Sequence, residues 1–492
     1  MRNINFKILN PLILLLTITI HLIFISIPPV NYEELFVHAS KYLEENNKSQ
    51  LNFYFKYQAN SLFFSYVIYF LNFGIDGIYI GKLISCVGYI FLFFGIKNFL
   101  TEVEYSDKKK FFVLCFIFFN PLIWSLGFRS TPDFISFAIG FYGTSLITTR
   151  FSKNFFKYSI GSIFVGLSIS IKIHSIFFLL FLFFYFFFKK KIFEKKELIN
   201  FLILTIFIFI IPILFYYFNY KKFGFLLVNN YFKATHNFAI IDFPEIFLNY
   251  LGFISLIFFP FSFFAFLKFF KKLIFVITLF VIFTIGYNFL TIHGEMDIGF
   301  LNYFLNKKIL AGIYSVFSFI LLISIFSLNK KSRQQFLFTI FTVLSFIILL
   351  SLSRPANRYL LYVVPFFFIF IFSKQDISEK LYFYCKNFYF FLFLILNILI
   401  LNNHYATGHG INDLLNHIKQ NNLNKYYINY ENIFPHRPLF VKKYGWPQKE
   451  LNSSKPNYLV TKNIKKNDKI VYSSCRNILN LRKNCYYLIK LE

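Results

Sequence analysis

The sequence predicts an all-α polytopic membrane protein that carries a small α/β domain at its C-terminus. Hydrophobic residues make up 57% of the 492 positions, and phenylalanine alone occupies 80 of them. Many apolar runs approach or exceed the roughly 18 to 20 residues that a helix needs to cross a bilayer. Polar residues separate these runs and dominate the region 404–492, which is long enough for a small domain.

The excess of basic residues predicts membrane topology. The formal net charge is +29, but lysine and arginine fall in short clusters between apolar runs, without the basic stripe of a nucleic-acid groove. We therefore exclude nucleic acid as a partner. Because Lys and Arg are retained preferentially in cytoplasmic loops, the clusters mark the inner face, as at Lys108–Lys110, Lys189–Lys191 and Lys330–Arg333.

The first apolar run, over residues 8–27, follows a basic start, so we expect a cytoplasmic N-terminus. Residues 27–30 lack a small-x-small cleavage site, which favours a retained signal anchor over a cleaved signal peptide. Alternation of the basic clusters then accommodates roughly thirteen spans within a transmembrane domain over residues 1–403. An odd number of spans places the region 404–492 outside the cytoplasm.

The first outer loop, over residues 28–77, opens on the adjacent carboxylates Glu33 and Glu34. The chain has only 22 acidic residues, so a pair at the exit of the first helix is conspicuous. Within this loop, residues 61–70 predict a short helix lying in the membrane interface. Outer loops are also expected around residues 219–244 and 291–308.

The C-terminal region has a mixed pattern. It predicts a helix over residues 411–420 and strands over 425–430 and 469–473. Cys475 and Cys485 flank a predicted hairpin, and on the outer side of a membrane they could form a disulfide.

Several short segments, taken together, resemble the GT-C superfamily of integral-membrane glycosyltransferases. The resemblance is closest to the polyprenyl-phosphate-sugar-dependent branch, which includes protein mannosyltransferases and lipid A aminoarabinose transferases. It covers most of the chain, although each motif is short. The segments are the acidic pair after the entry helix, Gly74-Ile75-Asp76-Gly77, Asn120-Pro121 followed by Arg129-Ser130-Thr131-Pro132-Asp133, Gly166-Leu167 followed by Lys172, and Arg358-Tyr359-Leu360 with Pro365.

This resemblance implies transfer of a sugar, a hexose or a pentose, from a polyprenyl-phosphate donor to a lipid, glycan or protein acceptor outside the cytoplasm. It places the catalytic carboxylate at Glu33 or Glu34. The family motif usually reads Asp-Glu or Asp-x-Asp. Aligning Phe36 and Ala39 with its later positions puts Tyr32 on the family's Asp, whereas a shift of one or two residues puts Glu33 or Glu34 there. The choice between the two glutamates, and an inactive member, both stay open.

Sugar transfer of this kind needs a base near the acceptor hydroxyl and cations near the departing phosphate. The candidate donor-phosphate-binding residues on the outer side are Arg129, Lys172, His174, Arg354 and Arg358. No metal-ligand spacing is present, and the outer cluster of His293, Glu295 and Asp297 supports none. A divalent cation as cofactor is therefore neither required nor excluded.

Each candidate also has a structural interpretation. Carboxylates after a span are often solvated loop residues, and arginines at helix ends often extend to the interface. Lys172 is either an ionisable residue within a span, which favours function, or a turn residue where the helix breaks. Asp133 either orients Arg129 or caps the following helix, and capping is the favoured prediction.

Two further classes of function fit a polytopic chain. One is a transporter or flippase of lipid-linked sugars, which usually shows internal repeats and polar residues at the midplane. The other is a lipid-linked polysaccharide ligase or polymerase, which uses a large late outer loop. No repeat is visible and the early loop is the larger, so we favour an enzyme. A bacterial inner membrane is the expected location, although an endoplasmic reticulum enzyme would have the same topology.

Overall fold

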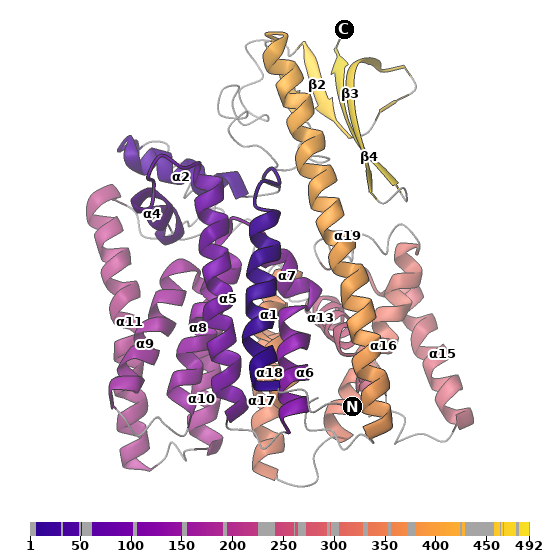
Figure 1. Ribbon diagram of the computed structural model, residues 1–492. Helices are drawn as coiled ribbons and strands as arrows, with labels where there is room; N and C mark the ends of the chain where they lie inside the picture. Colours follow the sequence, from indigo (N-terminus) through magenta and orange to yellow (C-terminus); the bar gives the residue numbers. More distant parts are fainter. Residues whose placement is uncertain are drawn as a thin grey trace.

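The computed structural model is predominantly helical (Figure 1). It describes residues 6–30, 33–48, 51, 62–101, 106–149, 155–189, 194–224, 242–259, 261–263, 272–292, 296, 305–327, 333–352, 356–370, 379–423, 426–428, 457–462, 464–465, 467–478 and 482–491. The helices are α1 (Phe6–Ile23), α2 (Glu33–Glu44), α4 (Phe63–Phe70), α5 (Gly77–Thr101), α6 (Asp107–Phe118), α7 (Pro121–Gly127), α8 (Pro132–Thr148), α9 (Phe155–Ile171), α10 (Phe177–Lys189), α11 (Lys195–Phe223), α13 (Phe243–Phe258), α15 (Lys272–Phe289), α16 (Lys307–Ser327), α17 (Arg333–Ser351), α18 (Val364–Phe370) and α19 (Glu379–Gln420).

Four of the described helices are long and apolar enough to cross a membrane. They are α5, α11, residues Lys307–Ser324 of α16 and residues Phe383–Gln420 of α19. A fifth is obtained if α6 and α7, which meet at a bend of 54°, are counted as one broken span. The prediction of a helical membrane protein is therefore confirmed at this level, whereas the number of spans stays a prediction.

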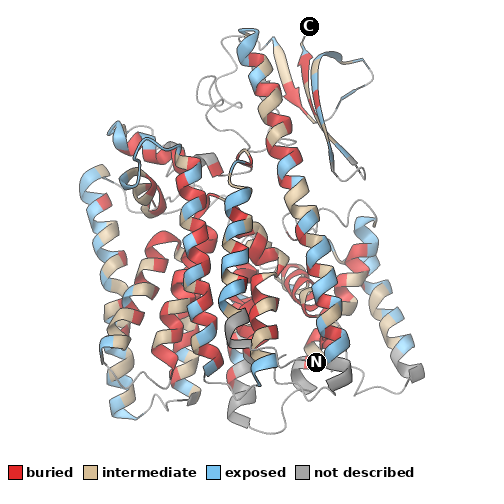
Figure 2. Cartoon of the chain, in the orientation of Figure 1, coloured by how far each residue is buried: buried red, intermediate tan, exposed pale blue. Residues whose placement is uncertain are grey.

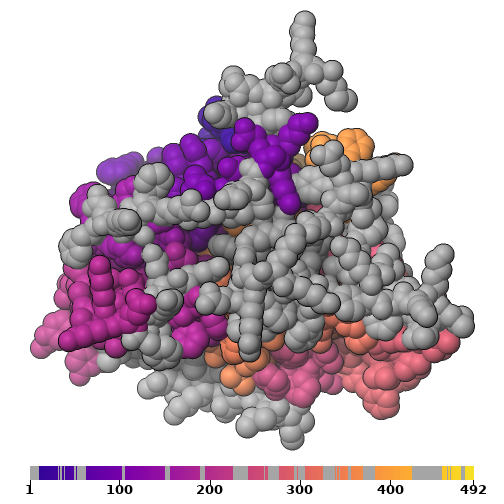
Figure 3. All heavy atoms as spheres, turned by 90° about the horizontal axis from the view of Figure 1, so that it is seen from below, coloured from indigo at the N-terminus to yellow at the C-terminus, as the bar shows by residue number. Residues whose placement is uncertain are grey.

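Helix α8 lies at the centre of the packing, between α5 and α9. Nearly all of its side chains are buried, and glycines allow close approach of its neighbours: a Cβ atom at Gly143 would lie 2.6 Å from the carbonyl oxygen of Gly161 on α9. Buried residues fill the interior, whereas α11 carries many exposed apolar residues on the outside (Figure 2). Viewed from below, the segments of α9–α11 and of α15–α16 occupy opposite sides of the bundle (Figure 3). Exposed apolar residues such as those of α11 are typical of helices that are surrounded by lipid.

Two short elements lie at the end of the bundle opposite the N-terminus. Helices α2 and α4 pack against each other there, and the sheet lies at the same end (Figure 1). The predicted helix over residues 61–70 is observed as α4. Helices α2 and α4 and the C-terminal sheet thus lie at one end of the molecule, while the topology relative to a membrane stays a prediction.

The C-terminal part is a four-stranded sheet packed on the end of α19. Its strands are β1 (Tyr426–Ile428), β2 (Tyr458–Thr461), β3 (Lys469–Ile478) and β4 (Arg482–Lys490), in the order β1-β2-β4-β3. Strands β1 and β2 are parallel, and the other pairs are antiparallel. Apolar side chains of α19 and the sheet form one core, namely Ile411, Leu414, Leu415 and Ile418 with Val460, Tyr486 and Leu488.

Several predictions for this region are matched by observed elements. The predicted strands over 425–430 and 469–473 correspond to β1 and β3, and Cys475 and Cys485 form a disulfide within the β3–β4 hairpin. The predicted helix over 411–420 is the end of α19, which runs without interruption through residues 403 and 404. The predicted domain boundary therefore falls inside a helix that begins among the apolar residues of the bundle.

Candidate functional site

Glu33 is the first residue of α2 and is only 2% exposed. Its Oε1 atom accepts a hydrogen bond from the backbone N–H of Val30, and its Oε2 atom accepts one from the backbone N–H of Ser130, each at 3.0 Å. The carboxylate thus connects the chain leaving α1 to the corner between α7 and α8. Its position at a helix N-terminus also favours a negative charge. The side chain of Glu34, the other predicted catalytic residue, lies outside the described residues.

A buried lysine lies near Glu33. Lys82, on α5, donates hydrogen bonds to the carbonyl oxygens of Ile25 and Ile27, which follow the end of α1. Glu33 is close enough to act on Lys82 electrostatically. Lys82 was not among the predicted site residues, although an ionisable residue inside an apolar run is itself a signal of a functional position.

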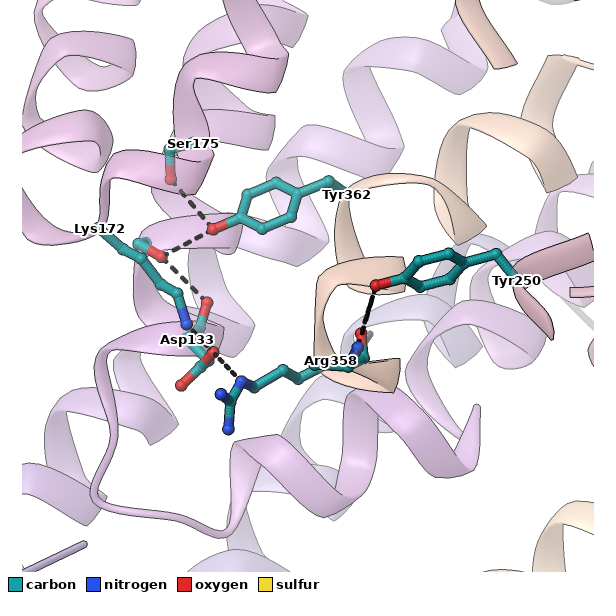
Figure 4. Close-up of polar contacts among 8 residues, drawn as sticks. Asp133, Lys172, Ser175, Tyr250, Arg358 and Tyr362 are labelled. Carbon is teal, nitrogen blue, oxygen red and sulfur yellow. Dashed lines mark hydrogen bonds and ion pairs between the residues drawn. The ribbon is translucent and has the colours of Figure 1, made fainter. Parts of the chain in front are cut away.

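Asp133 is the centre of a second charged group. Its carboxylate, in the first turn of α8, forms a hydrogen-bonded ion pair with Lys172 and lies 4.0 Å from Nε of Arg358 (Figure 4). The side chains of Asp133 and Lys172 are 12% and 5% exposed, whereas that of Arg358 is 26% exposed. The N-cap of α8 is Thr131, so Asp133 does not cap the helix as the sequence favoured. Its carboxylate instead joins two predicted phosphate-binding cations.

Lys172 enters this group because the helix breaks beside it. Helix α9 ends at Ile171, Lys172 is extended (φ −151°, ψ 121°), and a 3-10 turn over Ile173–Ile176 leads into α10. The helix therefore breaks at Lys172, as the turn interpretation expected, and its side chain is also buried and ion-paired, while a functional role stays a prediction. His174, in the same turn, stacks on the ring of Tyr359 with centroids 4.2 Å apart.

The residues around Arg358 are fixed by tyrosine hydroxyls. Arg358 and Tyr359 belong to a 3-10 helix over Asn357–Tyr362, preceded by Ala356. The backbone N–H of Ala356 donates to the hydroxyl of Tyr250 on α13 at 3.0 Å. At the other end, the Tyr362 hydroxyl lies 3.2 Å from Oγ of both Ser136 and Ser175 (Figure 4). These bonds hold the short helix between α8, the 3-10 turn over Ile173–Ile176 and α13.

The aromatic ring of Tyr359 brings the predicted cations together. Nζ of Lys172 and Cζ of Arg358 each lie 5.5 Å from its centroid, within the range of a cation–π interaction. Lys172, His174 and Arg358, three of the candidate phosphate-binding residues, thus lie in one group, although Arg358 comes from a distant segment of the chain. Tyr359 was part of the family motif but was not predicted as a site residue.

Arg129 lies on the corner that also carries Ser130 and Asp133. Its Nη2 atom is 3.2 Å from Nε2 of His404 on α19, and its carbonyl oxygen accepts a hydrogen bond from Ser85. The remaining predicted phosphate-binding residue, Arg354, lies outside the described residues, as do His293, Glu295 and Asp297. Within the described part of the chain, no three His, Cys, Asp or Glu side chains form a group that could hold a metal ion.

The corner over residues 129–133 connects the two charged groups. Glu33 binds the backbone of Ser130, and Asp133 holds Lys172 and Arg358 three residues further along. An array of carboxylates and cations at helix ends can bind an anionic ligand and accept a proton from it or from a second reactant. No family model, curated protein or solved structure matches this chain.

Proposed function

We propose that this chain is a membrane glycosyltransferase that moves a sugar from a polyprenyl-phosphate donor to a lipid, glycan or protein acceptor outside the cytoplasm. One observation carries the proposal: carboxylates and cations from distant segments meet near the ends of apolar helices. They form two groups on either side of the corner over residues 129–133. Glu33, Lys82 and Arg129 belong to the first, and Asp133 with Lys172 and Arg358 forms the second. A lipid-linked phosphate suits this arrangement because its chain is apolar and its head group is anionic.

Arg358 is the best candidate for direct contact with the donor phosphate. Its side chain is more exposed than those of Asp133 and Lys172, while the carboxylate of Asp133 and the ring of Tyr359 fix its position. A guanidinium can bind two phosphate oxygens at once through parallel N–H groups. Lys172 contributes positive charge from behind the carboxylate. Together these cations would stabilise the negative charge of the departing polyprenyl phosphate.

Glu33 is the candidate base, with Glu34 as its neighbour in sequence. A carboxylate has about four acceptor positions on its two oxygens, and the two backbone N–H groups occupy one on each. A further position can therefore accept a proton. In the proposed step, the acceptor oxygen attacks the anomeric carbon, its proton passes to the carboxylate, and the carbon–oxygen bond to the phosphate breaks with its electrons on the phosphate.

The proposal includes the topology expected from the sequence, with roughly thirteen spans and the site on the outer face. Besides the four long apolar helices, six shorter apolar helices support a larger number of spans. They are Asn10–Ile23, Phe156–Ile171, Ile173–Phe188, Phe243–Phe258, Val276–Phe289 and Asn357–Ile369. A bacterial inner membrane, with the N-terminus cytoplasmic and the sheet outside, is the proposed location.

The direct test is sugar transfer by the purified chain in lipid nanodiscs. Labelled polyprenyl-phosphate hexoses and pentoses would be offered with membrane acceptors, and transfer compared for Glu33→Gln, Glu34→Gln and the double variant. Loss of the base is expected to lower the rate by about 10² to 10⁴-fold. Glu44→Gln is the matched control, because Glu44 is exposed at the other end of α2. Full transfer by the double variant would contradict the assignment of either glutamate as the base.

A second measurement addresses the donor phosphate. Arg358→Gln is expected to raise the KM for the donor about tenfold or more, because a charge-assisted contact is lost. Lys97→Gln on the exposed face of α5 is the control for a change of surface charge. Sugar uptake by proteoliposomes that is unaffected by Glu33→Gln and Arg358→Gln, without any transfer, would instead favour the transporter class.

A further inference from the structure

His404 contacts one of the predicted phosphate-binding cations from an element distant in sequence. Its side chain lies on α19, is buried, and places Nε2 3.2 Å from Nη2 of Arg129. A guanidinium can only donate hydrogen bonds, so Nε2 must be the acceptor. The imidazole is therefore neutral in this contact, with its proton on Nδ1. A protonated ring has no acceptor and cannot make the bond.

Helix α19 is fixed against the candidate site on both sides of His404. Before it, the Asn397 side-chain amide donates to the carbonyl oxygen of Phe119 at 2.9 Å. After it, Gly408 packs so closely on the chain leaving α1 that a Cβ atom there would lie 2.6 Å from the carbonyl oxygen of Pro28. His404 is thus held at the corner by the backbone of α19 and not only by its own side chain.

The C-terminal part of the same helix packs on the sheet. Asn484 on β4 donates to the hydroxyl of Thr407 at 3.0 Å, and Arg476 on β3 donates to the carboxylate of Asp413. Thr407, which contacts the sheet, and His404, which contacts Arg129, lie one turn apart on α19. His404 is the residue at which this connection reaches the candidate site.

We propose that neutral His404 is a positioning residue, which holds the Arg129 guanidinium in the orientation that receives the donor phosphate. Two charged groups from other elements act on the ring, Arg129 itself and Lys82 on α5, and both are cationic. The role toward phosphate rests on the proposed function, whereas the contact between the two side chains does not.

The contact can be tested without any sugar transfer. Thermal unfolding midpoints of the full chain in nanodiscs would be compared for Arg129→Met, His404→Leu and the double variant at pH 7.5. The two losses are expected to be non-additive, because either substitution removes the same bond. Additive losses would overturn the inference.

The positioning role is tested by the donor KM of the His404 variants. His404→Leu is expected to raise the KM about tenfold while kcat changes little, as a hydrogen bond to a charged group is lost. His404→Gln supplies an amide oxygen that can accept the same bond, so its KM should stay within about twofold of the wild type. It also serves if His404→Leu fails to fold, since Arg129→Met should then show the higher KM alone. The control is His417→Gln, further along α19, which should keep the wild-type KM because His417 stacks on Tyr472 of the sheet.

The two measurements separate this inference from the proposed function. If the wild type transfers no sugar but the unfolding midpoints are coupled, the contact stands and the proposed function fails. If transfer occurs and His404→Leu and Arg129→Met both keep the wild-type KM, the positioning role is overturned while the glycosyltransferase stands.

Discussion

Replacing Glu33 with glutamine tests whether its carboxylate joins two parts of the fold. Each carboxylate oxygen accepts one backbone hydrogen bond, from Val30 and from Ser130. A glutamine amide has one oxygen and one NH₂ group, so it can accept only one of them. The other backbone N–H would then face a donor in a buried environment. The change is nearly isosteric, which leaves the hydrogen bonds as the main difference.

The expected loss of stability follows from these contacts. A hydrogen bond to a charged group is worth about 1.5 to 3 kcal/mol, and a bond between neutral groups about 1 kcal/mol. Glu33→Gln weakens one bond of the first kind to the second kind and loses the other. The sum is a destabilisation of about 3 kcal/mol.

The measurement is the free energy of unfolding in mixed micelles, followed by helicity during a reversible titration with denaturing detergent. Glu44→Gln on the same helix is the control, since Glu44 is exposed and should change stability by no more than about 0.5 kcal/mol. Equal stability of the two variants would refute the bridging role of Glu33. The result also decides how a loss of sugar transfer in Glu33→Gln is understood, because an unstable variant can lose activity without losing a base.

Three further predictions follow from single contacts. Asp133→Asn leaves Lys172 buried beside a neutral group and should destabilise the protein by about 3 to 5 kcal/mol, measured in the same titration. A loss below about 1 kcal/mol would show that the pair is not buried in the membrane-bound protein. Cys475→Ser removes the disulfide to Cys485, which closes a loop with a sequence separation of 10, and should lower the stability of the sheet by about 3 kcal/mol. Hydrogen exchange of β3 and β4 that is no faster than in the wild type would contradict this prediction. Tyr362→Phe should cost about 1 kcal/mol and leave the donor KM nearly unchanged, because its hydroxyl binds only side chains of the fold; a large rise in KM would place it in the site.

The helical part of the fold was predictable because the signal is local. The run over 77–101 is apolar enough to be recognised without any knowledge of its neighbours, and it is observed as α5. Interruptions of a helix are harder to predict. The 3-10 turn after Ile171 leaves no mark in the hydropathy pattern, whereas the bend between α6 and α7 coincides with a local signal, Asn120 as the N-cap of α7 followed by Pro121.

For the candidate site, the sequence indicated residue types but not their pairings. Lys172 and Arg358 were recognised as cations beside apolar runs, and the structure brings them together. Their common partner Asp133 was expected to cap a helix, because Asp is among the residues preferred at helix N-caps, but Pro132 before it occupies the first helical position and Thr131 is the N-cap. Lys82 and His404 were missed, since neither belongs to a recognised motif and each acquires its partners only when α1, α5, α7 and α19 are assembled.

By itself the sequence determined that this chain is helical and membrane-embedded, that its basic clusters alternate with apolar runs, and that an acidic pair follows the first helix. Those properties depend on neighbouring residues along the chain, where hydrophobic burial and helix period act. Only the tertiary structure decided that Glu33 binds the backbone of Ser130, that Asp133 joins Lys172 to Arg358, and that His404 faces Arg129. The physical reason is that an ionised group inside an apolar bundle must find its partners wherever packing places them, and packing is not a local property of the sequence.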